Sequence, residues 1–133
     1  MTYSSGMSEL GGVPSIRESG FAAEVTSEQT LVLVVMRGNA DAMIETALRE
    51  LVQQLHRAAT TQRARVVHID FTQLEFMNAA SLNTFVEWLT LIDDLPAGDR
   101  YVLRFTLNPK LLWQQRSLRT LTAFASHLVE VAS

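Results

Sequence analysis

Apolar residues alternate with polar ones in the first half of the chain, and this period of two predicts strands. Two strands are expected at residues 21–26 and 30–37, joined by a polar turn at residues 27–29. The second strand is apolar at nearly every position, which is typical of burial on both faces of a sheet. Three further strands are predicted at residues 66–71, 101–107 and 128–131.

A period of 3.6 residues marks three helices between these strands. The first is expected from an N-cap at Asp41 to about residue 59. The second covers about residues 79–95, and the third follows Asn108 and Pro109, read as an N-cap and a proline at the first helical position. The core stripe expected of the second helix is Leu82, Phe85, Val86, Leu89 and Ile92.

The order strand, strand, helix, strand, helix, strand, helix, strand predicts one α/β domain, a mixed sheet with helices packed against it. We place this domain at residues 20–133. Residues 1–19 are rich in Ser and Gly and have little periodicity, so a mobile N-terminal tail is expected there.

Composition narrows the class of function. The chain has 133 residues, no cysteine and a net charge of −3. An acidic chain with scattered arginines argues against nucleic acid as a partner. The longest apolar run, residues 31–36, is far shorter than the roughly 20 residues of a membrane span. A cytoplasmic protein that does not contact a membrane is therefore expected, and the oligomeric state stays open, a homodimer included.

One loop carries the most specific pattern in the sequence. Phe76-Met77-Asn78-Ala79-Ala80-Ser81 follows an apolar strand and opens a helix, which creates an anion-friendly, partner-facing corner. The segment resembles the STAS domains of bacterial anti-sigma-factor antagonists, whose loop reads roughly apolar, Asp, Ser, Ser, Gly. In that family the serine directly after the acid is phosphorylated. The resemblance covers essentially residues 20–131 and implies the STAS fold, with the order β-β-α-β-α-β-α-β.

The chain departs from the family at the residues that carry the switch. Aligned on the loop, Asn78 replaces the acid, Ala79 stands at the phosphoacceptor and Ala80 at the next serine. Asn78 remains a good helix N-cap. Ser81, on the family's glycine, is the one hydroxyl left in the motif, and we weigh a structural hydroxyl against a displaced phosphorylation site.

The same helix has a second stripe opposite its expected core face, formed by Ser81, Thr84, Trp88 and Leu91. Aromatic anchors dominate the energetics of many interfaces, so Trp88 is either such an anchor or a side chain packed on a neighbouring element. Trp113-Gln114-Gln115-Arg116 in the last helix also resembles a family variant. The expected partner-binding residues are Asn78, Ala79, Ala80, Ser81, Thr84 and Trp88.

Enzymatic motifs, paired histidines at helical spacing and phosphate-binding glycine loops are missing. Asp93, Asp94 and Asp99 fit a turn better than a calcium loop, so we expect no metal and no cofactor. A catalytic reading rests only on His68, Asp70 and Ser81 meeting at one strand end. The remaining alternative is a small-ligand module, in which Asn78 and Asp70 frame a nucleotide, an anion or an apolar metabolite.

The leading hypothesis is therefore a non-enzymatic STAS-like regulator. The resemblance implies a protein partner of the anti-sigma-factor or serine-kinase type and partner switching in bacterial signalling or transcription control. Without the acceptor serine, the chain is expected to stay in the binding-competent form.

Overall fold

The computed structural model describes residues 8–9 and 15–132, and within them seven strands form one sheet. The strands are β1 (Ser8–Glu9), β2 (Ile16–Glu18), β3 (Phe21–Glu28), β4 (Leu31–Ala40), β5 (Val66–Met77), β6 (Val102–Thr106) and β7 (Val129–Ala132). The helices are η1 (Ala42–Ile44), α1 (Glu45–Gln62), α2 (Ala79–Asp93), η2 (Ala97–Asp99), α3 (Leu112–Phe124) and η3 (Ser126–Leu128), where η denotes a 3-10 turn. From β3 onward, the predicted order of strands and α-helices is confirmed.

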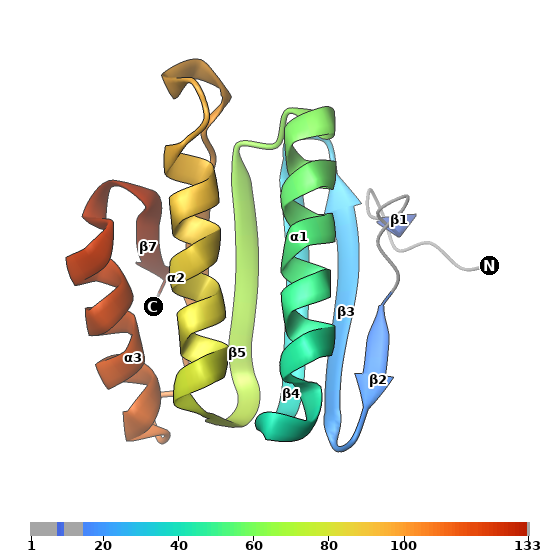
Figure 1. The fold of residues 1–133 in the computed structure, drawn as a ribbon, viewed down its shortest axis with the longest axis vertical. Helices are drawn as coiled ribbons and strands as arrows, with labels where there is room; N and C mark the ends of the chain where they lie inside the picture. Colours follow the sequence, from blue (N-terminus) through green and yellow to red (C-terminus); the bar gives the residue numbers. More distant parts are fainter. Residues whose placement is uncertain (1–7, 10–14, 133) are drawn as a thin grey trace.

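The sheet is mixed, as predicted. Its strand order is β1-β3-β4-β5-β6-β7, and β2 pairs with β3 as well. β3 runs antiparallel to β4, whereas β4, β5, β6 and β7 run parallel to one another. All three α-helices cover the same face of the sheet, with α2 between α1 and α3 (Figure 1). The fold therefore has two layers, one of helices and one of strands.

The core lies between these two layers. Every second residue of the central strands is buried, as in Val67, Ile69 and Phe71 of β5, while the residues between them are partly exposed. β4 follows the same alternation, with Val32 and Val34 buried and the apolar residues between them only half-buried. The expectation that β4 is buried on both faces is wrong, because none of the helices in the described part of the chain covers the second face of the sheet.

The N-terminal boundary lies earlier than expected. β2 pairs with the first residues of β3 through the register Ile16 to Ala23, and β1 pairs with the end of β3. Ser15 Oγ accepts a hydrogen bond from the Val25 amide at 3.1 Å. Within the tail predicted for residues 1–19, Ser8–Glu9 and Ile16–Glu18 therefore pair with β3. Residues 1–7 and 10–14 lie outside the described part of the chain.

Three elements, β4, β5 and α3, differ in extent from the prediction. β4 continues through Gly38, which adopts a φ of +87°, to Ala40, and β5 runs on to Met77. At the third helix, Asn108 does not cap α3. Its Oδ1 accepts from the Lys110 amide at 3.0 Å within a turn, and α3 begins only at Leu112.

Candidate protein-binding site

The three α-helices begin at one end of the molecule, at the carboxyl ends of the parallel strands (Figure 1). The segments that meet there are the β4–η1 turn, the β5–α2 junction and the start of α3. Junctions between a strand and the following helix present their side chains at the edge of a rigid sheet. This edge contains the Asn78 loop that the sequence singles out.

Asn78 is the N-cap of α2, as predicted. Its Oδ1 accepts from the Ser81 amide at 2.8 Å, and its Nδ2 donates to Glu45 Oε2 at 3.0 Å. The Asn78 amide donates to the Ala40 carbonyl at 2.9 Å. The cap is thus tied to α1 and to the end of β4, so the first turn of α2 has a fixed position.

Small and apolar side chains are exposed around this cap. Ala79 and Ala80 form the first turn of α2 and are exposed. Large exposed side chains at the same edge are Phe76, at 46% of its full exposure, Met43 at 72% and Leu112 at 63%. We call Met43, Phe76, Ala79, Ala80 and Leu112 the apolar corner. Exposed apolar groups gathered at one edge are typical of a protein interaction surface.

Three of the six predicted contact residues do not belong to this surface. Ser81 and Trp88 are fully buried and Thr84 is 3% exposed. The Ser81 hydroxyl donates to the Ala40 carbonyl at 3.3 Å, and the Thr84 hydroxyl donates to the Ala80 carbonyl at 3.3 Å. The predicted exposure of these side chains is wrong, and the alternatives of a packed Trp88 and a structural Ser81 hydroxyl are the ones observed. With its hydroxyl buried, Ser81 is not accessible to a kinase in the folded protein.

The physical reason is the position of α2 between α1 and α3. A helix that contacts a sheet below and a helix on each side buries more than one stripe of its surface. The buried residues of α2 therefore include Trp88 as well as Phe85 and Leu89, while Leu82 and Val86 of the expected stripe are only partly buried. Its solvent side is formed by Asn83, Glu87, Thr90 and Leu91.

Trp88 is part of a polar chain inside the core. Its Nε1 donates to Tyr101 Oη at 2.8 Å, and Tyr101 Oη lies 2.6 Å from His56 Nδ1. Burial raises the pKa of Tyr101, against the opposing effect of the hydrogen bond from Trp88. The phenol therefore stays neutral and supplies the partner that a buried indole N–H requires.

We expect the protein to lose stability as the pH falls from 7.5 to 5.5. Burial lowers the pKa of His56, and burial together with Arg104 lowers that of His68 below the ordinary value of 6.5. The unfolded chain then binds more protons than the folded chain below about pH 6.5. Urea midpoints at the two pH values measure the loss. His56→Gln keeps an acceptor for Tyr101 but does not titrate, so the urea midpoints at the two pH values should lie closer together than in the native chain. If they lie equally far apart or farther, His56 does not contribute to the loss of stability.

Side chains at the start of α3 form hydrogen bonds with the part of β5 that extends beyond its pairing with β6. β6 pairs with β5 only as far as Asp70, which leaves the later β5 carbonyls without strand partners on that side. Gln114, fully buried, donates from Nε2 to the carbonyls of Phe71 and Leu74 at 2.7 and 2.9 Å. Its Oε1 accepts from the Asn108 amide at 2.7 Å. These bonds fix the strand that leads into the apolar corner.

Two neighbours of Gln114 act in the same way. Trp113 Nε1 donates to the Glu75 carbonyl at 2.8 Å, and Asn108 Nδ2 donates to the Thr72 carbonyl at 3.1 Å. Sequence reasoning singled out Trp113-Gln114 as a family-like motif but missed this role. The signal was a polar residue, Gln114, at a position where the helix period predicts burial.

The residues of the catalytic hypothesis do not come together. His68 and Asp70 occupy the β5 positions on the face of the sheet without helices, whereas Ser81 packs within the helix layer. His68 Nε2 lies 2.5 Å from Thr106 Oγ1. Asp70 accepts from the Thr72 amide and hydroxyl. No two of these three residues hydrogen-bond to each other in the described structure.

Three cavities of the described structure lie away from this loop. They measure about 570, 300 and 80 Å³ and lie between α3 and β7, between α1 and α2, and at the end of α1. None of the three is lined by Asn78 or Asp70. Among residues 8–9 and 15–132, no group of three or more His, Asp or Glu side chains is placed to hold a metal ion. The described helices are also too short or too polar to cross a bilayer.

Comparison with known proteins identifies the fold. No protein-family model matches the chain, and no curated protein matches it. Among solved structures, an anti-sigma factor antagonist from Mycobacterium paratuberculosis matches with a TM-score of 0.56 at 14% identity, over 77% of this chain and 80% of that one. The anti-sigma factor antagonist SpoIIAA in its unphosphorylated form matches with a TM-score of 0.50 at 14% identity, over 84% and 89%. The chain has the STAS fold of these antagonists.

Proposed function

We propose that this chain is a non-enzymatic regulatory protein that binds a protein partner through the apolar corner. The partner class is an anti-sigma-factor or serine-kinase protein, and the setting is partner switching in the bacterial cytoplasm. The observation that carries the proposal is the exposed first turn of α2, where Ala79 stands at the position of the family's phosphoacceptor and no hydroxyl is accessible.

Ala79 has no hydroxyl that could accept a phosphate, and this determines how the proposed regulator would work. Phosphate on a serine there adds nearly two negative charges and bulk at the docking surface. An alanine keeps that surface neutral, and the buried Ser81 offers no substitute in the folded state. The chain is thus a permanently binding-competent form, and its control lies in its amount or in a competing protein.

The apolar corner has the chemistry of a docking surface. Met43, Phe76 and Leu112 offer large side chains that lose water on binding, which favours association. Ala79 and Ala80 let a partner approach the backbone closely at the positive end of the α2 dipole. Because Asn78 and Gln114 fix the two segments, little order has to be created on binding.

We expect Ala79→Glu to weaken partner binding by about tenfold or more, because a charge enters an apolar contact. The measurement is calorimetric titration with each purified anti-sigma-factor kinase encoded in the genome that carries this gene. A glutamate in the first turn of a helix is favourable to the helix dipole, so the variant should unfold no earlier than the native chain.

The matched control is Ala97→Glu, which adds the same charge at an exposed site in η2 at the other end of α2. This control should bind as the native chain does. Equal affinity of the native chain and Ala79→Glu would show that the docking surface lies elsewhere. Failure of every kinase to bind would refute the partner class.

A further inference from the structure

A cleft lined by three arginines lies at the opposite end of the sheet from the apolar corner. Its walls are the end of α1 with Arg63 and Arg65, and the η2 segment with Gly98, Asp99 and Arg100. Backbone bonds join the two walls, since the Val102 amide donates to the Arg65 carbonyl at 3.1 Å. The cleft is therefore built from two segments more than thirty residues apart in sequence.

Positive charge dominates the lining of this cleft. Three arginines and one acidic residue, Asp99, are among its lining residues, in a chain whose net charge is −3. Within the described residues, the side chains of Arg63 and Arg65 make no hydrogen bond or ion pair, whereas Arg37 and Arg104 on the sheet pair with Glu24 and Glu130. The two cleft arginines are thus available to an external anion.

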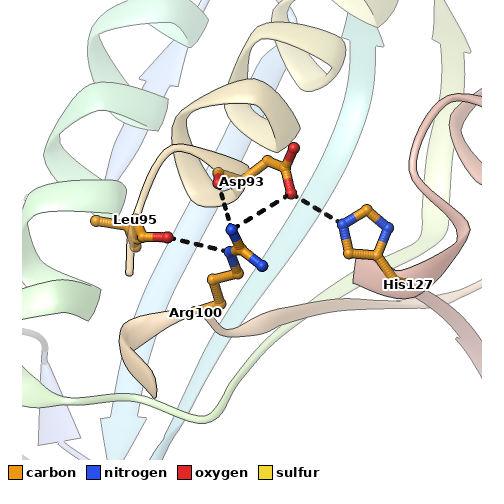
Figure 2. Close-up of polar contacts among 4 residues, drawn as sticks. All are labelled: Asp93, Leu95, Arg100 and His127. Atoms are coloured by element: carbon orange, nitrogen blue, oxygen red, sulfur yellow. Dashed lines mark hydrogen bonds and ion pairs between the residues drawn. The ribbon is translucent and has the colours of Figure 1, made fainter. Parts of the chain in front are cut away.

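Arg100 is held in place at the edge of the cleft. Its Nε donates to the Leu95 carbonyl at 3.1 Å and its Nη2 donates to the Asp93 carbonyl at 2.9 Å, as Figure 2 shows. The Asp93 carboxylate lies 4.0 Å from Nη2 and 2.9 Å from His127 Nε2, and the hydrogen bond to His127 lowers the pKa of Asp93. The third nitrogen, Nη1, has no partner in the described structure.

Arg63 occupies a backbone conformation that arginine disfavours. It is the C-cap of α1, with φ and ψ of +58° and +45° in the left-handed region. Glycine is the usual residue at helix ends of this kind, because a side chain there costs about 1 kcal/mol or more. Here the conformation closes the helix, because the Arg63 amide donates to the Thr60 carbonyl at 3.3 Å and the Ala64 amide donates to the Ala59 carbonyl at 2.9 Å. These bonds fix the backbone of the cleft wall at residues 63 and 64.

The size of the cleft selects the ligand. Its volume is about 80 Å³, whereas sites for larger organic ligands measure about 300–1,000 Å³. The cleft therefore suits a small ion such as a tetrahedral oxyanion and is too small for a nucleoside. Guanidinium groups bind phosphate oxygens through paired, charge-assisted hydrogen bonds.

We propose that the Arg63–Arg65–Arg100 cleft binds a phosphate group, either as the free ion or as a monoester. The test uses the full-length chain labelled with ¹⁵N, titrated with inorganic phosphate and separately with phenyl phosphate at constant ionic strength. Both probes should give saturable shifts of the amides at residues 63–65 and 98–100 and of the Arg63 and Arg65 Nε resonances. Tighter binding of phenyl phosphate identifies an ester as the ligand, and tighter binding of inorganic phosphate identifies the free ion.

Two variants and a control separate binding from folding. Arg65→Gln should weaken phosphate binding about tenfold. Arg63→Gly should weaken it similarly while the melting temperature stays level or rises, because glycine relieves the left-handed conformation. Arg57→Gln, on the exposed surface of α1, should bind as the native chain does. Shifts that do not saturate, that spread to Arg57 and Arg116, or that survive in both cleft variants would overturn the proposal.

Discussion

Trp88→Ala is expected to destabilise the protein by about 3–5 kcal/mol, the usual cost of emptying a large aromatic site in a core. Trp88 is completely buried, and its ring lies 6.0 Å from that of Phe85 between centroids. The substitution leaves a cavity and also leaves Tyr101 Oη without the indole donor. A domain has only about 5–15 kcal/mol of stability, so much of the reserve is lost.

The control for Trp88→Ala is Leu91→Ala on the solvent side of the same helix. Leu91 is 37% exposed, so its truncation should change stability by only about 0.5–1 kcal/mol. Urea unfolding of both variants gives the comparison. If Trp88 were an interface anchor, Trp88→Ala would unfold near the native midpoint and lose partner affinity instead. That result would contradict the placement of Trp88 in the core.

Gly38→Ala should be the most damaging glycine substitution in the described chain, at about 2–5 kcal/mol. A Cβ at Gly38 would lie 1.9 Å from the Gly20 carbonyl oxygen and 3.0 Å from its carbon. That oxygen also accepts from the Asn39 amide at 3.1 Å, so it cannot move away without breaking a hydrogen bond. The positive φ of +87° adds strain of its own.

Gly20→Ala is the matched control for that clash. Gly20 has a similar φ of +80°, but a Cβ there would meet nothing within 4 Å. Only the cost of the backbone conformation remains, about 1–2 kcal/mol. Thermal unfolding of both variants separates the cost of the steric clash from the cost of the backbone conformation. Equal losses for the two variants would mean that the β3–β4 hairpin adjusts freely around Gly38, and the close approach would not matter.

Local patterns in the sequence were sufficient to predict the strands and α-helices from β3 onward, but not β1 and β2. Alternation in Tyr101-Val102-Leu103 and helical spacing in Leu48-Leu51-Leu55 record which side of each segment is buried, whatever the partner. The N-cap at Asn78 was predictable for the same reason, since its main hydrogen bond reaches only three residues. The lengths of β4 and β5 were not predictable, because they depend on pairing between distant strands and on Gln114.

The main error of the sequence-based prediction concerns which side chains of α2 are exposed to solvent. The sequence of this helix has apolar or small residues on two sides, and this pattern fits both a helix with an exposed docking stripe and a helix buried between two others. Only the position of α2 between α1 and α3 decides, and that position is a property of the whole fold. The N-cap at Asn78 was therefore predicted correctly, whereas the exposure of Ser81, Thr84 and Trp88 was predicted wrongly.

The site that remains is compact and is set by the fold around it. Asn78 and Glu45 fix the start of α2, and Gln114 and Trp113 fix the strand before it. The exposed residues Ala79 and Ala80 carry no functional group. Under the proposed function, this surface binds a partner and is not switched off by phosphate on its own motif.

Hydrogen–deuterium exchange of the chain, free and in complex with the kinase that binds it, tests this account most directly. The account predicts slower exchange on binding at residues 41–44, 76–80 and 111–113, with little change at residues 63–65 and 97–100. Mass spectrometry of the same complex with ATP should find no phosphate on Ser81. Protection confined to the helix-free face of the sheet, or phosphate on Ser81 of the folded chain, would contradict the account.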